Sequence, residues 1–237
     1  MIWNPWHGCH KKSPGCLNCY MFRRDAKYDL DSNIVRKTKT FDMIIKKHRD
    51  GTYVVKDDLV YICMTSDFFI EEADLWRKEI WQMIKERSDL NFYIITKRIE
   101  RFSVSLPDDW GLGYPNVTIC VTCENQTMAD ERIPILLSLP IKHKEIIHEP
   151  MLEEIHIEKY LETGLIEHVT CGGESGDHAR KCNYDWILNM RNACIKYHVP
   201  FTFKQTGANF VKNNKLYHIP RSEQLKQARK ANIDLFY

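Results

Sequence analysis

The sequence has no long hydrophobic run, no internal repeat and no low-complexity tract. None of its apolar stretches approaches the ~20 residues that a membrane-spanning helix needs. Residues 1–5 show neither the charged region nor the hydrophobic region of a secretory signal. These absences argue against a membrane protein, and we expect a cytoplasmic protein with no membrane partner.

The sequence also has little net charge, only +2, but that charge is unevenly distributed. Residues 1–57 contain 12 basic and 6 acidic residues, residues 58–203 contain 15 and 24, and residues 204–237 contain 7 and 2. An acidic middle between basic ends favours a local anionic partner over a generally adhesive surface. An ordinary solvated surface is the alternative.

Six short runs rich in β-branched and aromatic residues recur along the chain, at residues 60–64, 92–95, 117–121, 145–147, 167–171 and 201–203. Such runs are typical of strands that are buried on both faces. We also expect a short first strand at Ile2 and Trp3.

Three amphipathic stretches lie between these runs, and their apolar residues recur at helical spacing. They are Trp76, Ile80 and Ile84; Ile133, Leu136 and Leu137; and Ile187, Met190, Cys194 and Tyr197. Strands that alternate with helices form parallel sheets. We therefore predict an α/β fold of six to seven βα units with mostly parallel strands, arranged as a complete or partial (β/α) barrel. We expect one domain over residues 1–237, with an open doubly wound sheet as the alternative.

Polar residues follow each predicted strand. They are Thr65-Ser66-Asp67, Thr96-Lys97-Arg98, Thr122-Cys123-Glu124-Asn125, His148-Glu149-Pro150, Gly172-Gly173-Glu174-Ser175 and Lys204-Gln205-Thr206. In barrels and α/β sheets, the carboxyl ends of the strands converge on the active site. The series therefore predicts one shared cavity, although any single residue in it also suits a helix cap or a solvated loop.

Nine cysteines are present, and they fall into different settings. Cys63, Cys120, Cys171 and Cys194 lie inside apolar stretches and are expected in the core. By contrast, Cys9, Cys16 and Cys19 lie among Gly, Pro, Ser and Asn in a loop at residues 3–20, with the spacing C-x6-C-x2-C.

The spacing of these three cysteines leaves several roles open. Zinc would need a fourth ligand, which His7 or His10 could supply. A catalytic thiol would need a base, and His10 follows Cys9 directly. Three thiolates on a [4Fe–4S] cluster would leave one iron open to S-adenosylmethionine. Spacing alone does not decide between zinc and iron–sulfur.

The loop, with its Trp-Asn-Pro start and its Ser-Pro-Gly-Cys-x-x-Cys-Tyr end, resembles the three-Cys-motif proteins of phages and bacteria. That family of unknown function looks like a divergent branch of the radical S-adenosylmethionine superfamily. The resemblance continues through most of the chain, in Thr65-Ser66-Asp67-Phe68-Phe69, Thr96-Lys97-Arg98, Glu124-Asn125, Ala129-Asp130-Glu131-Arg132, Glu149-Pro150, Gly172-Gly173-Glu174-Ser175-Gly176 and Phe203-Lys204-Gln205-Thr206-Gly207. The loop departs from the usual C-x3-C-x2-C pattern, because its first gap is six residues and Asn18 replaces the aromatic residue before the last cysteine.

The resemblance implies a phage protein of TIM-barrel type that is a radical enzyme with a [4Fe–4S] cluster and S-adenosylmethionine as cofactors. Cys9, Cys16 and Cys19 would bind the metal. The cofactor would be held by Ser66 and Asp67 at its amino group, by Glu124 and Asn125 at its ribose, by Lys97 at its carboxylate, and by Gly172 and Gly173 near its adenine or the substrate. The expected catalytic residues are Glu149, Glu174 and Lys204, for which salt bridges among themselves are the ordinary alternative.

The sequence says less about the substrate and the partners than about the cofactors. Basic side chains interleaved with aromatic ones occur around the loop and in the basic C-terminal tail at residues 208–237. This combination suits a phosphate backbone with stacked bases, so nucleic acid modification is expected. One alternative is a zinc-stabilised nucleic-acid-binding protein without catalysis. The other is radical modification of a peptide or partner protein, because family members often lie beside a partner gene.

Overall fold

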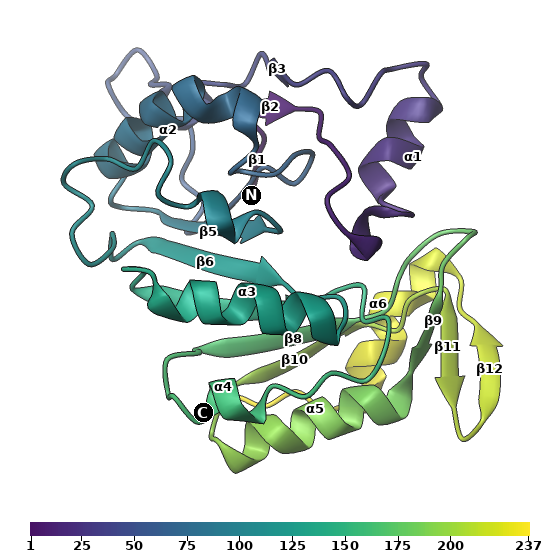
Figure 1. Cartoon of the computed structure of the whole chain (residues 1–237). Coiled ribbons are helices and arrows are strands. Elements are labelled where there is room, and N and C mark those ends of the chain that lie inside the picture. The colour runs from purple at the N-terminus through teal and green to yellow at the C-terminus, as the bar shows by residue number, and fades with distance from the viewer. The chain divides into compact units, whose positions relative to one another are not determined.

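A computed structural model describes all 237 residues of the chain, and its largest element is a seven-stranded sheet (Figure 1). In spatial order the strands are β1 (Ile2–Trp3), β4 (Leu59–Ile62), β5 (Asn91–Thr96), β6 (Val117–Thr122), β7 (His143–His148), β8 (His168–Gly172) and β10 (Phe201–Gln205). The pairs β1–β4, β4–β5, β7–β8 and β8–β10 are parallel. The order runs from β1 to β10 without closing, so the predicted α/β fold is confirmed as a partial (β/α) barrel.

Helices connect the strands, as the hydrophobic periodicity predicts. They are α2 (Asp74–Glu86), α3 (Gln126–Ser138), α4 (Glu158–Leu161) and α5 (Tyr184–Lys196). The three predicted amphipathic stretches lie within α2, α3 and α5, except for Tyr197, which follows α5 directly. No helix is both long enough and apolar enough to span a bilayer.

The remaining elements are small. Strands β2 (Trp6–His7) and β3 (Arg36–Lys37) form an antiparallel pair, and β9 (Lys181–Asn183), β11 (Asn209–Lys212) and β12 (Lys215–His218) form a three-stranded sheet. Helices α1 (Tyr20–Ala26) and α6 (Arg221–Ala231) and the 3-10 helices η1 (Pro14–Cys16), η2 (Met43–Ile45), η3 (Glu71–Ala73) and η4 (Ile99–Arg101) complete the chain. The expected basic tail at residues 208–237 is therefore a folded segment, because α6 packs on β10 and Phe210 stacks on Phe203.

The contacts divide the chain into two compact units that alternate along the sequence. Unit 1 contains Met1–Lys12, Met21–Cys120 and Leu139–His143, and unit 2 contains Ser13–Tyr20, Val121–Ser138 and Lys144–Tyr237. Each unit is described below by itself. The single domain expected over residues 1–237 stays a prediction.

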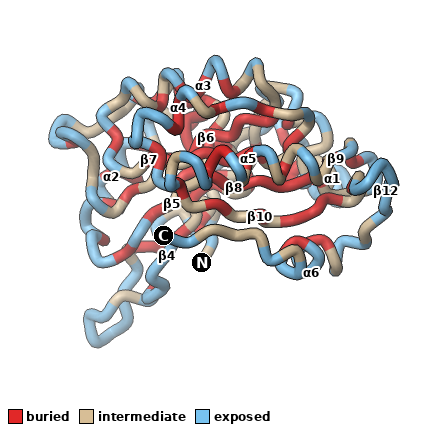
Figure 2. Tube along the Cα trace, turned by 90° about the horizontal axis from the view of Figure 1, so that it is seen from below, coloured by how far each residue is buried: buried red, intermediate tan, exposed pale blue.

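Each unit has its own hydrophobic core. The core of unit 1 contains an aromatic cluster, in which the Phe68 ring lies 5.6 Å from Trp6 and 4.9 Å from Trp81, centroid to centroid. In unit 2 buried residues run along β8 and β10, whereas β12 is exposed throughout (Figure 2). Burial of these side chains on the strands and helices is the main source of stability for such a fold.

A buried arginine on α2 fixes the segment that follows β4 in unit 1. The Arg77 side chain is 0% exposed and lies against the ring of Phe69, 5.5 Å from its centroid. Its guanidinium donates to the carbonyl oxygens of Phe68 at 2.8 Å and Ile70 at 2.7 Å, and it pairs with Asp74 at 2.8 Å. One side chain thus donates to two backbone carbonyl groups of the turn that follows β4.

Replacing Arg77 with leucine is expected to lower the free energy of unfolding by about 3 kcal/mol, because the carbonyl oxygens of Phe68, Ile70 and Val104 lose the guanidinium as a donor. Urea denaturation followed by far-UV circular dichroism measures the change. The neighbouring Lys78 is exposed on the same helix, so Lys78→Leu serves as the control and should change stability by less than about 0.5 kcal/mol. Equal effects of the two substitutions would contradict this role for Arg77.

Candidate metal and cofactor site

The cysteine loop contributes to both units: Cys9 belongs to unit 1, and Cys16 and Cys19 belong to unit 2. In each unit its residues are bound to side chains that follow a strand of the large sheet. The carboxyl ends of strands are where such folds carry their sites.

In unit 1 the loop is held against the turn after β4. The Gly8 amide donates to the Thr65 carbonyl at 3.2 Å, and the Ser66 hydroxyl donates to the Gly8 carbonyl at 2.5 Å. Gly8 has a φ of 101°, and a Cβ atom there would lie 2.4 Å from the Ile34 carbonyl oxygen, so only glycine fits. Ser66, predicted to bind the cofactor, thus holds the backbone next to Cys9.

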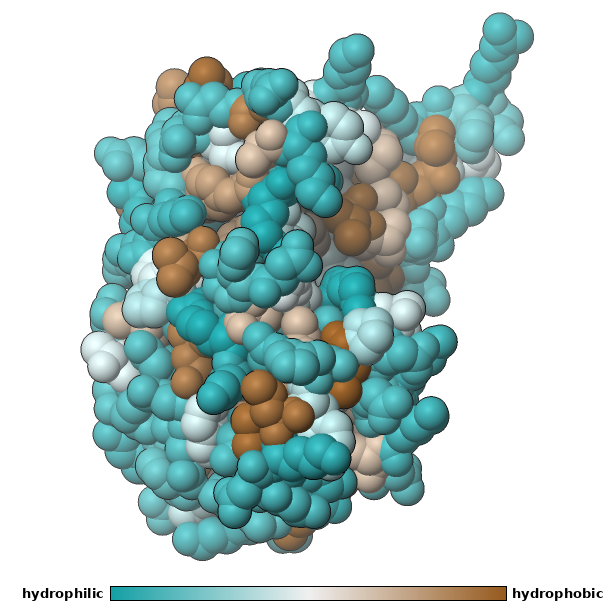
Figure 3. All heavy atoms as spheres, turned by 90° about the vertical axis from the view of Figure 1, so that its right-hand side faces the viewer, coloured by the Kyte–Doolittle hydropathy of each residue, from teal (hydrophilic) through white to brown (hydrophobic).

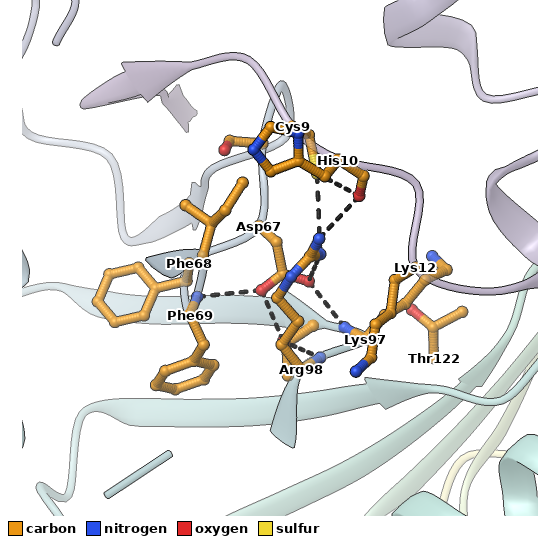
Figure 4. Close-up of polar contacts among 12 residues, drawn as sticks. Cys9, His10, Lys12, Asp67, Phe68, Phe69, Lys97, Arg98 and Thr122 are labelled. Carbon is orange, nitrogen blue, oxygen red and sulfur yellow. Dashed lines mark hydrogen bonds and ion pairs between the residues drawn. The ribbon is translucent and has the colours of Figure 1, made fainter. Parts of the chain in front are cut away.

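Arg98 connects Cys9 to the end of β5 (Figure 4). Its guanidinium donates to Cys9 Sγ at 3.8 Å and to the His10 carbonyl at 2.7 Å, and it pairs with the Asp67 carboxylate at 3.5 Å. Arg98 is 8% exposed. A buried guanidinium that donates to sulfur stabilises negative charge on that sulfur, which suits a metal-bound thiolate.

Asp67 is the acceptor at the centre of this network. Its Oδ1 accepts from the Thr96 hydroxyl at 2.8 Å and the Phe69 amide at 3.0 Å, and its Oδ2 accepts from the Lys97 amide at 2.9 Å. The carboxylate therefore joins the ends of β4 and β5 and holds Arg98. A role in binding the amino group of a cofactor stays a prediction, and it would have to share these oxygens.

In unit 2 the loop closes over Glu124, the second residue after β6. Glu124 Oε1 accepts from the Ser13 hydroxyl and from the Gly15 amide, the latter at 2.8 Å, and Oε2 pairs with Arg132 of α3 at 2.9 Å. Glu124 is 0% exposed. Its neighbour Asn125 accepts from the Met128 amide at 2.9 Å and so caps α3. Both residues predicted to contact ribose are thus engaged with the chain itself.

Glu174, which follows β8, holds the end of the loop. Its Oε2 accepts from the Asn18 amide group at 3.0 Å and from Arg180 Nε at 2.9 Å, while Arg180 Nη1 donates to the Pro14 carbonyl at 2.9 Å. Burial alone would raise the pKa of Glu174, but the bonds from Arg180 and Asn18 outweigh burial and lower it. Glu174 is therefore a carboxylate that positions the loop around Cys16 and Cys19.

The ends of β7 and β10 carry a second polar group in unit 2. Lys204 Nζ pairs with Glu149 Oε2 at 2.6 Å, and Gln205 Nε2 donates to Glu149 Oε1 at 2.6 Å. A Cβ atom on Gly172 would lie 3.2 Å from Glu149 Oε1, and one on Gly173 would lie 2.2 Å from the Thr206 carbonyl oxygen. Glu149 and Lys204 therefore form the salt bridge considered for them, and Gly173 lets the backbones of two strand ends approach.

Accessibility separates the three loop cysteines from the other six. Cys9, Cys16 and Cys19 are half-buried and form no disulfide, whereas Cys63, Cys120, Cys123, Cys171, Cys182 and Cys194 are buried. The core positions expected for Cys63, Cys120, Cys171 and Cys194 are thus confirmed. Burial raises the pKa of Cys182 and Cys194 to about 12, so these two stay protonated. Neither unit alone groups three His, Cys, Asp or Glu side chains as metal ligands.

The family match covers residues 1–233 and is described as a protein of unknown function, DUF5131. The chain belongs to the DUF5131 family. No curated protein and no solved structure matches this member of the family. The predicted membership in an uncharacterised family is confirmed, and the radical-enzyme ancestry and the phage origin stay predictions.

The structure gives roles to three arginines to which the sequence assigned none. Arg98 stands among the expected strand-end residues, but its bond to Cys9 depends on tertiary contact. Arg132 and Arg180 carry no signal that pairs them with Glu124 and Glu174, eight and six residues away.

Replacing Glu124 with alanine is expected to release the loop, because the Gly15 amide loses its acceptor and Arg132 loses its partner. Hydrogen–deuterium exchange of peptides covering residues 13–20 should rise at least tenfold, while exchange in α2 stays unchanged. Glu131→Ala, on an exposed side chain of α3, is the control. Unchanged exchange at residues 13–20 would contradict the anchoring role.

Glu174 gives a pH dependence of fixed sign. Because its folded-state pKa lies below the ordinary 4.5, its stabilisation is fully present above pH 4.5 and is lost as the pH falls through the folded-state pKa. Glu174→Gln should cost about 2 kcal/mol at pH 7, and the difference from wild type should narrow below pH 4.5. Urea denaturation between pH 7 and pH 3 tests this, with Glu131→Gln as the control. A pH-independent difference would show that the carboxylate charge is not what stabilises the loop.

Proposed function

We propose that the chain is a radical S-adenosylmethionine enzyme that binds a [4Fe–4S] cluster through Cys9, Cys16 and Cys19. The observation that supports it is the accessibility of these three thiols, which lie in one loop, while the other six are buried. Thiolates are the usual ligands of iron–sulfur clusters, so the donor set fits the group. The proposal requires the three sulfurs to converge on one cluster.

When bound, such a cluster supplies an electron that cleaves S-adenosylmethionine and yields a 5′-deoxyadenosyl radical. The chain's own residues would position and tune this chemistry. Arg98 donates to Cys9 Sγ, and Glu124 and Glu174 hold the part of the loop that carries Cys16 and Cys19. Hydrogen bonds to the sulfurs are among the features that set the reduction potential of a cluster.

The expected cofactor contacts from Ser66, Asp67, Lys97, Glu124, Asn125, Gly172 and Gly173 belong to the same proposal. Of these, Lys97 contributes only its backbone amide to the contacts around Asp67, so its ammonium group suits an anionic carboxylate best. At the other strand ends, Glu149 and Lys204 form a pair whose two charges suit proton transfer or the binding of a polar substrate. Nucleic acid is the proposed substrate, and a peptide or partner protein is the alternative.

Anaerobic purification tests the cluster directly. Wild-type protein should be brown, contain about four irons per chain as a [4Fe–4S] cluster requires, and release 5′-deoxyadenosine with reductant and S-adenosylmethionine. Cys9→Ala, Cys16→Ala and Cys19→Ala should each lose most of the iron and all of the cleavage.

Cys194→Ala is the matched control, because it removes a buried thiol outside the loop. It should retain the iron while losing some stability. Stoichiometric zinc without iron after anaerobic reconstitution would contradict the proposal and favour the zinc-stabilised nucleic-acid-binding alternative.

A further inference from the structure

The small three-stranded sheet of unit 2 carries only positive formal charge. Its strands β9, β11 and β12 contain three lysines and no acidic residue. Lys212 and Lys215 flank the turn between β11 and β12, and every residue of β12 is exposed. We call these two strands and their turn, residues 209–218, the hairpin.

The hairpin lysines differ from several lysines of the basic N-terminal segment, which are paired with carboxylates. In unit 1, Lys37 pairs with Glu79 at 2.9 Å and Lys47 pairs with Glu86 at 3.9 Å. Lys212 and Lys215 form no ion pair; their ammonium groups lie 4.5 Å and 5.3 Å from the ring centroids of Tyr184 and Tyr217. No acidic side chain therefore balances the positive charge of these two hairpin lysines.

The root of the hairpin is packed on the core of unit 2, and its tip is exposed to solvent. Phe210 is 7% exposed and stacks on Phe203 with 5.9 Å between ring centroids. At the tip, Asn213 and Asn214 have φ of 52° and 58°, the left-handed pair of a tight two-residue turn. The side of Figure 1 that carries β12 faces the viewer in Figure 3, where hydrophilic residues cover most of the surface.

The register places the useful side chains on one face. Lys212 is opposite Lys215 and Tyr217 is opposite Phe210, so all three point to the side of the hairpin that packs on the core through Phe210, and they are exposed beside it. Tyr217 itself is 39% exposed. Two unpaired lysines beside an exposed aromatic ring suit phosphates together with a stacked base.

We infer that the hairpin is a nucleic-acid-binding surface on which Lys212 and Lys215 contact backbone phosphates and Tyr217 stacks on an unpaired base. This surface needs no cluster, so it stands apart from the proposed enzymatic activity. An exposed edge strand such as β12 also suits pairing with a strand of a protein partner, but that mode uses backbone groups and does not depend on the lysine charges.

The test is fluorescence anisotropy with labelled 20-nucleotide single strands of DNA and RNA between 50 and 200 mM salt. The double variant Lys212→Ala/Lys215→Ala should bind on the order of tenfold more weakly at 0.1 M salt. Its slope of log affinity against log salt should be shallower by about 1.4, since each phosphate contact on a single strand contributes about 0.7.

Two further variants separate the contributions. Tyr217→Ala should weaken binding about fivefold or more with the salt slope unchanged, because stacking releases no counterions. Lys37→Ala/Lys47→Ala removes the same charge from paired lysines of unit 1 and should leave the slope unchanged. Circular dichroism confirms that each variant is folded.

Absence of binding by wild-type protein at 50 mM salt, or an unchanged slope for Lys212→Ala/Lys215→Ala, would overturn the inference. Iron content and cleavage of S-adenosylmethionine are measured on the same preparations. Nucleic-acid binding by protein that contains no iron would refute the proposed cluster and support the hairpin surface. A brown protein that cleaves S-adenosylmethionine but binds neither DNA nor RNA would refute the hairpin surface and support the cluster.

Discussion

Carboxylates buried at the ends of the strands need hydrogen-bond donors, and the position of the cysteine loop depends on which groups donate to them. Glu124 is 0% exposed and Asp67 is 5% exposed, and an unpaired charge at that depth would be very costly. Glu124 is satisfied by Arg132, by Ser13 and by the Gly15 amide, so the loop itself supplies two of its donors. The burial of Glu124 in unit 2 and the placement of residues 13–15 of the loop therefore depend on the same hydrogen bonds.

The same constraint acts in unit 1 through an arginine. Asp67 takes its donors from the ends of β4 and β5, and it pairs with Arg98, whose remaining donors reach Cys9 Sγ and the His10 carbonyl. The position of Cys9 is therefore determined by this charge network and by Gly8, because only glycine fits against the Ile34 carbonyl at that position. Arg98 therefore positions Cys9, and its substitution should first change the conformation of the loop.

The expected site residues differ in the contacts that they already make within the chain. Glu124, Asn125 and Glu174 are engaged in holding the loop or capping α3, and Gly173 is required by the Thr206 backbone. Glu149 and Lys204 pair with each other. The carboxylates of Glu124 and Glu174 therefore position the loop that carries the cysteines, and in the proposed enzyme the three thiols would hold the metal.

Local sequence determined the fold class, because short β-branched runs such as residues 117–121 favour strands, and the four-residue spacing of Trp76, Ile80 and Ile84 gives a helix one apolar face. It also determined which cysteines stand apart, since Cys9, Cys16 and Cys19 lie among turn residues. The three-stranded sheet was not predictable, because β12 is exposed and has no hydrophobic alternation. Only tertiary structure decided that Arg98 contacts Cys9 and that Lys37 and Lys47 are paired with carboxylates while Lys212 and Lys215 are not. Those facts depend on residues brought together from distant parts of the chain, and no local pattern records such pairings.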